Sequence, residues 1–224
     1  MSTRYGGLLV ETIVNGPFME NCYLVADAES KQALLIDPGD EDERILEAIR
    51  TLGLTPKEIV CTHAHIDHAG AVAPLRRILG VPFALHGAER PWLERMPSQA
   101  AVFGLDPREV PEVDRELAPG ERIVLGEREA KVLFTPGHSA GGCCLHFASD
   151  GVVFVGDTLF QGSIGRSDLP GGSLRTLLRS IREELFTLPD ATVVFSGHGP
   201  ATTIGEERRT NPFLQPGALG DDDG

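Results

Sequence analysis

The chain has 224 residues, and 33 Asp or Glu against 20 Lys or Arg give it a formal net charge of −13 at pH 7. Its hydrophobic (41%) and charged (24%) fractions are those of an ordinary globular protein, and no window approaches the roughly 20 consecutive apolar residues of a membrane span. The negative charge disfavours nucleic acid and anionic membranes as partners, because both would repel the surface on average.

The termini and the cysteines indicate the organisation and the compartment. The N-terminal residues lack a basic stretch followed by an apolar one, so we expect a cytoplasmic protein. The length suits a single domain over residues 1–214, followed by an acidic tail at 215–224 that we expect to be disordered. Four cysteines without a C-x-x-C pair are too few for a disulfide framework, and we expect them to be free and buried.

The first third of the chain has the pattern of short strands followed by helices. Apolar and β-branched runs predict strands at 8–14, 22–26 and 33–37. Apolar residues at helical spacing then predict a helix over 41–52 that ends at Gly53, and a buried strand follows at 58–62. The next helix begins near residue 72, because Pro74 is tolerated only in a first turn.

Residues 87–118 have the least clear pattern of structural elements, and there we expect only some short helix around Pro91 and Glu94. Further strands are predicted at 122–125, 130–135, 143–148, 151–156 and 191–196. Apolar residues on one face predict a helix over 174–186. Two groups of strands, each accompanied by helices, predict an α/β protein with two sheets and helices outside them.

Five of the seven histidines and two aspartates follow strand-like runs directly. They are His63, His65, Asp67 and His68 after EIVC, His138 after KVLF, Asp157 after GVVFV, and His198 after TVVF. Loops that leave strand ends can converge on one edge of a layered core. Imidazole and carboxylate groups ligate zinc and similar divalent ions, and seven of them suit two ions that share a carboxylate. The other histidines, His86 and His146, are expected to be structural or surface residues.

The motifs THAHIDHAG, GHS, GDT and SGHGP, in this order, resemble those of the metallo-β-lactamase fold hydrolases. The segments GDTLFQGSIGRSDLPGG and GHGPATTIGEERRTNPFL resemble more narrowly the short bacterial glyoxalase II-like (hydroxyacylglutathione hydrolase) branch. The resemblance extends from LIDPGD to NPFL and implies an αβ/βα sandwich of two face-to-face β-sheets with helices on both outer sides.

The resemblance also implies roles for the clustered residues. It implies a first metal held by His63, His65 and His138, a second held by Asp67, His68 and His198, and Asp157 as the bridging carboxylate. Asp37 matches the buried aspartate that supports such sites from behind, and initiation of a turn before Pro38 is its alternative role.

The implied activity is metal-dependent hydrolysis of thioesters of the S-lactoylglutathione type by metal-bound hydroxide, which Asp67 would orient. We expect two divalent ions per chain, zinc first, with iron or a zinc–iron mixture as alternatives. Arg166, in the loop after Asp157, is the candidate for binding a substrate carboxylate, and a surface ion pair is its alternative role. The motifs contain no Tyr, Lys or spare His to protonate a poor leaving group, which favours a small-molecule thioester.

Two other activities of the same fold stay open. Iron-dependent persulfide dioxygenases share the H-x-H-x-D-H run and a G-R-x-D segment, but an aspartate typically follows their last histidine, where this chain has Gly199. A lactonase or β-lactam hydrolase is the weaker alternative, because β-lactamases of this fold do not carry the bridging Asp157. Few residues follow His198, so we expect no helical glutathione-binding domain, and glutathione itself as the thiol stays open. The oligomeric state stays open too.

Overall fold

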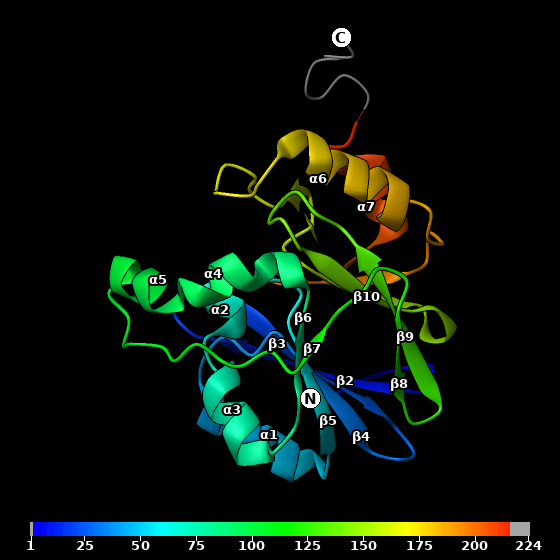
Figure 1. Cartoon of the computed structure of the whole chain (residues 1–224). Helices are drawn as coiled ribbons and strands as arrows, with labels where there is room; N and C mark the ends of the chain where they lie inside the picture. The colour runs from blue at the N-terminus through cyan, green and yellow to red at the C-terminus, as the bar shows by residue number, and fades with distance from the viewer. Residues whose placement is uncertain (1, 216–224) are drawn as a thin grey trace.

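Two β-sheets pack face to face at the centre of the molecule (Figure 1), and the computed structural model describes residues 2–215. The first sheet contains, in this spatial order, β1 (Thr3–Tyr5), β2 (Leu8–Asn15), β3 (Glu20–Asp27), β4 (Gln32–Ile36), β5 (Thr55–Val60), β6 (Phe83–Leu85) and β7 (Arg115–Glu116). Its first four strands pair antiparallel, and the pairs from β4 to β7 are parallel.

The second sheet has the strand order β15-β14-β11-β10-β9-β8. Its strands are β8 (Arg122–Leu125), β9 (Arg128–Phe134), β10 (Cys143–Phe147), β11 (Val152–Gly156), β14 (Val193–Ser196) and β15 (Thr202–Thr203). Only the β11–β14 pair is parallel. A small separate hairpin joins β12 (Leu159–Phe160) and β13 (Ser163–Ile164).

Helices cover the two outer faces of the sheets. The helices are α1 (Asp42–Leu52), α2 (Ile66–Ala69), α3 (Val72–Leu79), η1 (Gly87–Glu89), α4 (Arg90–Glu94), α5 (Met96–Phe103), η2 (Ala148–Asp150), α6 (Leu174–Ser180), the π-helical turn η3 (Ile181–Leu185) and α7 (Ile204–Thr210). In Figure 1, α1 and α3 lie below the strands, and α6 and α7 lie above them. The αβ/βα sandwich expected from the sequence is therefore confirmed.

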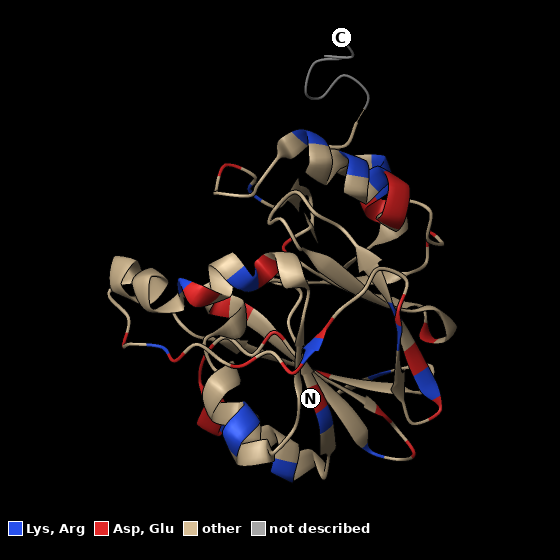
Figure 2. Ribbon diagram, viewed as in Figure 1, with Lys and Arg blue, Asp and Glu red and all other residues tan. Residues whose placement is uncertain are grey.

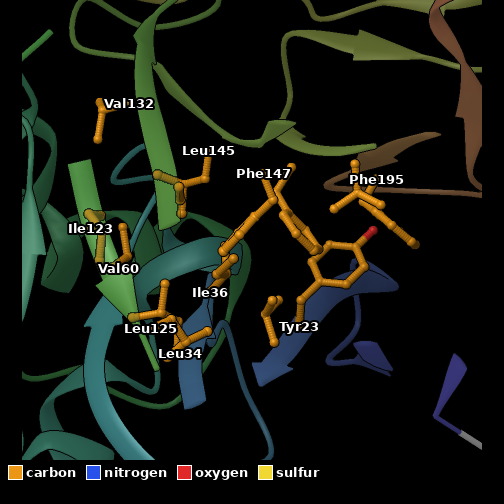
Figure 3. Close-up of a cluster of buried hydrophobic side chains, with 14 of the residues drawn as sticks. Tyr23, Leu34, Ile36, Val60, Ile123, Leu125, Val132, Leu145, Phe147 and Phe195 are labelled. Atoms are coloured by element: carbon orange, nitrogen blue, oxygen red, sulfur yellow. The ribbon is translucent and has the colours of Figure 1, made fainter. Parts of the chain in front are cut away.

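The alternation of side chains along the strands creates three apolar layers. Between the sheets, Tyr23 and Ile36 face Phe147 and Phe195 (Figure 3), and the Tyr23 and Phe195 rings pack edge to face at 5.5 Å. The opposite faces of the strands pack against the helices, which bury Ile45, Ile49 and Leu75 on the first sheet and Leu177, Ile181 and Leu185 on the second. Each sheet is thus apolar on both faces, and the strand ends and loops are left to carry polar chemistry.

The predicted elements are present, with ends that shift by at most three residues. The helix predicted at 41–52 ends at Gly53, which adopts φ +64°, and the next helix begins at Val72 as expected. The helix predicted over 174–186 is α-helical only to Ser180 and continues as the π-helical turn. In the stretch 87–118, α4 confirms the short helix expected there. The elements η1, α5 and β7 of this stretch, and β6 just before it, were not predicted because such short elements carry little periodicity.

Two further sequence expectations concern the cysteines and the tail. All four cysteines are free and buried, as predicted. Of the tail predicted at 215–224, only Gln215 lies within the described residues, where its side-chain amide donates to the Asn211 carbonyl (3.0 Å). Within residues 2–215, no helix has the length and apolar character needed to cross a membrane.

Candidate metal centre

The seven predicted ligands come together at one edge of the two sheets. His63 and His65 follow β5, Asp67 and His68 lie in α2, and His138, Asp157 and His198 follow β9, β11 and β14. Their donor atoms form overlapping groups of three, and within each group the donor atoms lie within 4.8 Å of one another. The first sheet therefore supplies four of the seven from one loop and one short helix, and the second sheet supplies one residue from each of three strand ends.

Three imidazoles converge in what we call the three-histidine group, His63, His65 and His138. The distances are 3.1 Å from His63 Nε2 to His65 Nδ1, 3.0 Å from His65 Nδ1 to His138 Nε2, and 3.3 Å between the two Nε2 atoms. Three nitrogens about 3.3 Å apart are what tetrahedral coordination at a zinc–nitrogen distance of about 2.0 Å requires. The residues present therefore fit a bound divalent ion.

Hydrogen bonds behind two of these rings leave the converging nitrogens free of protons. His138 Nδ1 donates to the backbone carbonyl of Arg166 (2.8 Å). The Thr62 hydroxyl donates to the Asp37 carboxylate (2.7 Å), so Thr62 Oγ1 accepts from His63 Nδ1 (3.1 Å). A neutral imidazole that donates from Nδ1 offers a lone pair at Nε2, so both Nε2 atoms are ready to bind metal.

The second cluster, which we call the mixed group, contains Asp67, His68 and His198. His198 Nε2 lies 3.3 Å from Asp67 Oδ2, and His68 Nε2 lies 3.9 Å from the same oxygen. Asp157 lies between the two groups, with Oδ1 3.3 Å from His68 Nε2 and Oδ2 3.7 Å from both His138 Nε2 and His198 Nε2. His68 Nε2 and Asp157 Oδ1 are buried without a hydrogen-bond partner, which is the state expected of ligand atoms.

The two groups differ in the protonation that their surroundings favour. Burial lowers the pKa of His63 well below its ordinary value, and burial together with His138 lowers the pKa of His65 to about 3. Burial also opposes the charge on His68, but Asp157 and Asp67 outweigh it and raise the pKa of His68 well above 6.5. His63 and His65 are therefore neutral, whereas the surroundings of His68 favour its protonated form.

His198 and the carboxylates complete the electrostatics of the mixed group. Burial opposes the charge of His198, but its hydrogen bond to Asp67 and the charge of Asp157 raise its pKa. Burial likewise opposes ionisation of Asp67 and Asp157, yet the charge of His68 outweighs it and lowers both carboxyl pKa values. Both aspartates are therefore carboxylates at neutral pH, the form that binds cations.

Asp37 supports the site from behind through three hydrogen bonds. Besides the Thr62 hydroxyl, its carboxylate accepts the Thr62 amide (2.6 Å) and His68 Nδ1 (3.1 Å), and it is almost fully buried. Asp37 adopts φ +51°, which ends β4 at Ile36. Gly197, on the far side, leaves no space for a side chain, because a Cβ would lie 2.2 Å from Asp157 Oδ1 and 2.6 Å from His68 Cε1.

Two residues of the segment 87–118, where the sequence predicted little structure, hold the His63–His65 loop in place. The buried Glu89 carboxylate accepts the Ala64 amide (2.9 Å) and the Gly141 amide (2.6 Å), and so ties this loop to the loop that carries His138. Gln99, on α5, accepts the Ile66 amide (3.0 Å) and donates to the Trp92 carbonyl (2.9 Å). The only sequence signal was polar residues among short apolar segments, which does not distinguish such a role from a solvated helix face.

A pocket of about 540 Å³ opens beside both groups. His65, Asp67, His138, Asp157 and His198 line its floor, and Phe18, Ile66, Trp92, Arg95, Ser98, Gln99, Val102, Phe103, Arg166 and Leu169 line the rest. Arg166 is exposed, and its guanidinium pairs with Asp168 through bonds of 2.8 and 2.9 Å. The side chain predicted to bind substrate thus lines the pocket, but it already has an acidic partner.

The other buried or half-buried titratable groups lie outside these two groups. His86 stacks on Phe134 at 4.8 Å, and His146 lies in β10 beside Lys131. Glu20 lies behind His68 and Asp37, where burial raises its pKa well above the ordinary carboxyl value and Asn15 donates to it (3.0 Å). The sequence did not single out Glu20.

A four-layer αββα sandwich with a His/Asp cluster for divalent metal at its strand ends defines a class of metal-dependent hydrolases. The chain belongs to the metallo-beta-lactamase superfamily, whose family model matches residues 15–198.

Three similar proteins cover nearly all of the chain. Hydroxyacylglutathione hydrolase GloC of Haemophilus influenzae is 40% identical over 212 residues, 92% of this chain and 97% of the relative. The BLEG-1 B3 metallo-beta-lactamase structure has a TM-score of 0.86 at 39% identity and covers 92% of this chain and 99% of its own. The structure of TTHA1623 in a di-iron-bound form has a TM-score of 0.84 at 44% identity, and the match covers 91% of this chain and 100% of that chain.

Proposed function

We propose that this protein hydrolyses thioesters of the S-lactoylglutathione type with two divalent ions bound at the two groups. The observation that carries the proposal is the convergence of seven donor atoms beside a pocket whose lining has no Lys or Tyr. A thiolate leaves as a stable anion and needs no proton donor, so this pocket suits a thioester better than an amide. The likeness to a named hydroxyacylglutathione hydrolase supports the same substrate class.

The ligand assignment in this proposal follows the geometry of the two groups. His63, His65 and His138 would hold one ion, Asp67, His68 and His198 the other, and Asp157 would contact both. Two divalent ions at these positions would supply Lewis acidity for the substrate carbonyl and lower the pKa of a water molecule between them.

Asp67 is the residue that we propose to act on the attacking water. Its carboxylate is ionised, lies on the pocket floor and accepts a hydrogen bond from His198 (3.3 Å). An oxygen of this carboxylate can accept a hydrogen bond from the water, orient it and hold its proton. Asp37 and the Arg166 carbonyl keep His68 and His138 in the required tautomers, and the Arg166 guanidinium would bind a substrate carboxylate at the pocket mouth.

The second candidate activity is β-lactam hydrolysis, which the likeness to a named B3 metallo-beta-lactamase favours. The deciding experiment combines elemental analysis with kcat/KM for S-lactoylglutathione, a homoserine lactone and a β-lactam, before and after removal and replacement of metal. We expect close to two ions per chain, of zinc or iron, and the largest kcat/KM for the thioester. Faster turnover of the lactone or β-lactam would overturn the substrate class, and one iron with oxygen-dependent persulfide oxidation would indicate a dioxygenase.

A further inference from the structure

One wall of the pocket, formed by α4 and α5, combines exposed apolar side chains with a cation. Helix α5 carries no Asp, Glu, Lys or Arg and is tan throughout in Figure 2. Two residues at its end, Val102 and Phe103, line the pocket and are 80% and 55% exposed. Phe103 contacts Phe18 edge to face at 4.9 Å, which extends the apolar surface to the β2–β3 turn. Exposed apolar surface beside a polar site is typical of a ligand-binding wall.

Arg95, at the junction of α4 and α5, lines the same pocket. Among residues 2–215 its guanidinium has no carboxylate within ion-pair distance, although the chain carries an excess of acidic residues. The other two arginines near this wall are paired, Arg90 with Glu116 (2.9 Å) and Arg166 with Asp168 (2.8 Å). A guanidinium without a partner can bind a ligand carboxylate bidentately without first breaking an ion pair.

We propose that this wall binds the thiol half of the substrate, with Arg95 paired to a carboxylate of an acidic thiol and Val102 and Phe103 packed against its non-polar part. The inference rests on the proposed thioester hydrolysis and specifies its substrate class. The metal groups lie on the pocket floor and would hold the thioester carbonyl, so a carboxylate several bonds away needs a separate cation. Such remote contacts act mainly on KM.

The position of Trp92 allows binding to be measured without turnover. It is the only tryptophan of the chain, lines the pocket, and lies 4.6 Å from the His65 ring, with its indole N–H donating to the Pro170 carbonyl (3.0 Å). Trp92 fluorescence should therefore respond to a thioether that cannot be hydrolysed. S-hexylglutathione supplies carboxylates, and S-hexyl-N-acetylcysteamine is its uncharged counterpart.

The test compares the metal-loaded wild type with Arg95→Ala, Arg95→Lys and the matched control Arg90→Ala, which removes a paired arginine outside the pocket. We expect Arg95→Ala to raise the Kd of S-hexylglutathione about tenfold, the order expected for one charge-assisted contact, and to leave the uncharged thioether unchanged. Arg95→Lys should recover part of the loss, and Arg90→Ala should bind like the wild type.

The role of Arg95 would be overturned if Arg95→Ala and Arg90→Ala bound S-hexylglutathione with equal Kd values. It would also be overturned if only Arg166→Ala lost the preference for the charged thioether over the uncharged one. Neither result would affect the proposed thioester hydrolysis. Charge-dependent binding that requires Arg95, in a protein that hydrolyses no thioester, would instead support the anion site and refute the proposed function. Sedimentation tests whether a second copy of the chain, rather than a ligand, covers this wall. A dimer that Phe103→Asp dissociates, with unchanged affinity for both thioethers, would overturn the wall as a ligand surface.

Discussion

The three-histidine group and the mixed group lie side by side, yet they differ in charge and in what supports them. In the three-histidine group, burial lowers the pKa values of His63 and His65, and Glu89 and the Arg166 carbonyl hold its loops. The mixed group combines a carboxylate with histidines of raised pKa, and Asp37 holds it through His68. Protons should therefore compete with metal much more strongly at the mixed group, because its histidines retain them to a higher pH.

The largest effect is expected where the two groups meet. Asp157→Asn removes the carboxylate between them, so both should lose metal, and hydrolysis should fall by more than the roughly 100-fold upper range for loss of a supporting partner. Thermal stability should fall as well, because bound metal stabilises the folded state. Elemental analysis and a melting curve check this, with the surface variant Asp190→Asn as control. Retention of two ions would show that the groups do not share Asp157.

His198→Ala separates the groups. The variant should keep an ion at the three-histidine group, lose the ion of the mixed group, and lose about 100-fold in kcat/KM, since it removes a ligand rather than a supporting partner. His146→Ala is the matched control and should keep both its metal and its rate. Equal losses in the two variants, measured by elemental analysis and steady-state kinetics, would contradict the assignment of ligands.

Acidification should release metal in two steps. The raised pKa values of His68 and His198 mean that their metal affinity is complete above those values and is lost as the pH falls through them. His65, with a pKa near 3, stays neutral over this range. As the pH falls through the raised pKa values of His68 and His198, in the presence of a chelator, metal content should fall from two ions to one. His198→Ala should show no such step. Simultaneous release of both ions from the wild type would contradict the expected difference in proton competition between the two groups.

The smallest effect distinguishes the two supports. Glu89→Gln replaces one acceptor oxygen by an NH2 group, which cannot accept a hydrogen bond, so either the Ala64 or the Gly141 N–H loses its acceptor. Metal affinity at the three-histidine group should fall about tenfold, in the range for a supporting residue, with little change at the mixed group. Asp37→Asn should lower metal affinity at both groups, because Asp37 accepts from His68 directly and orients His63 through the Thr62 hydroxyl. Competition with a chromogenic chelator measures the affinity of both groups, and identical profiles for the two variants would show that the support by Glu89 is not specific to the three-histidine group.

The ligands could be predicted, whereas most of their supports could not. His63, His65, Asp67 and His68 lie within six residues, and each other ligand directly follows an apolar run, so strand ends and metal-binding residue types coincide in the sequence. Glu89 and Gln99 carry no such signal. Their partners, the Ala64 and Ile66 amides, lie 25 and 33 residues away, and only packing of η1 and α5 against the loop brings them together.

Arg166 is a residue whose role the sequence predicted only in part. The sequence identified its side chain as a substrate contact, but the fold adds its backbone carbonyl as the acceptor for His138 and pairs its guanidinium with Asp168. A backbone carbonyl has no residue-type signature, and a cation such as Arg95, which has no carboxylate partner among residues 2–215, is recognised only when its neighbours in the fold are known.

The sequence by itself determined two groups of strands with helices outside them and the seven candidate ligands, because hydrophobic periodicity and residue chemistry are local properties, and the order of the αββα layers followed from the resemblance of its motifs to a known family. Only the tertiary structure decided which nitrogens meet about 3 Å apart, which residues hold them, and which wall of the pocket is apolar. Those features depend on contacts between segments far apart in the sequence, such as Asp67 with His198, and burial and neighbouring charges, rather than residue type, set their protonation.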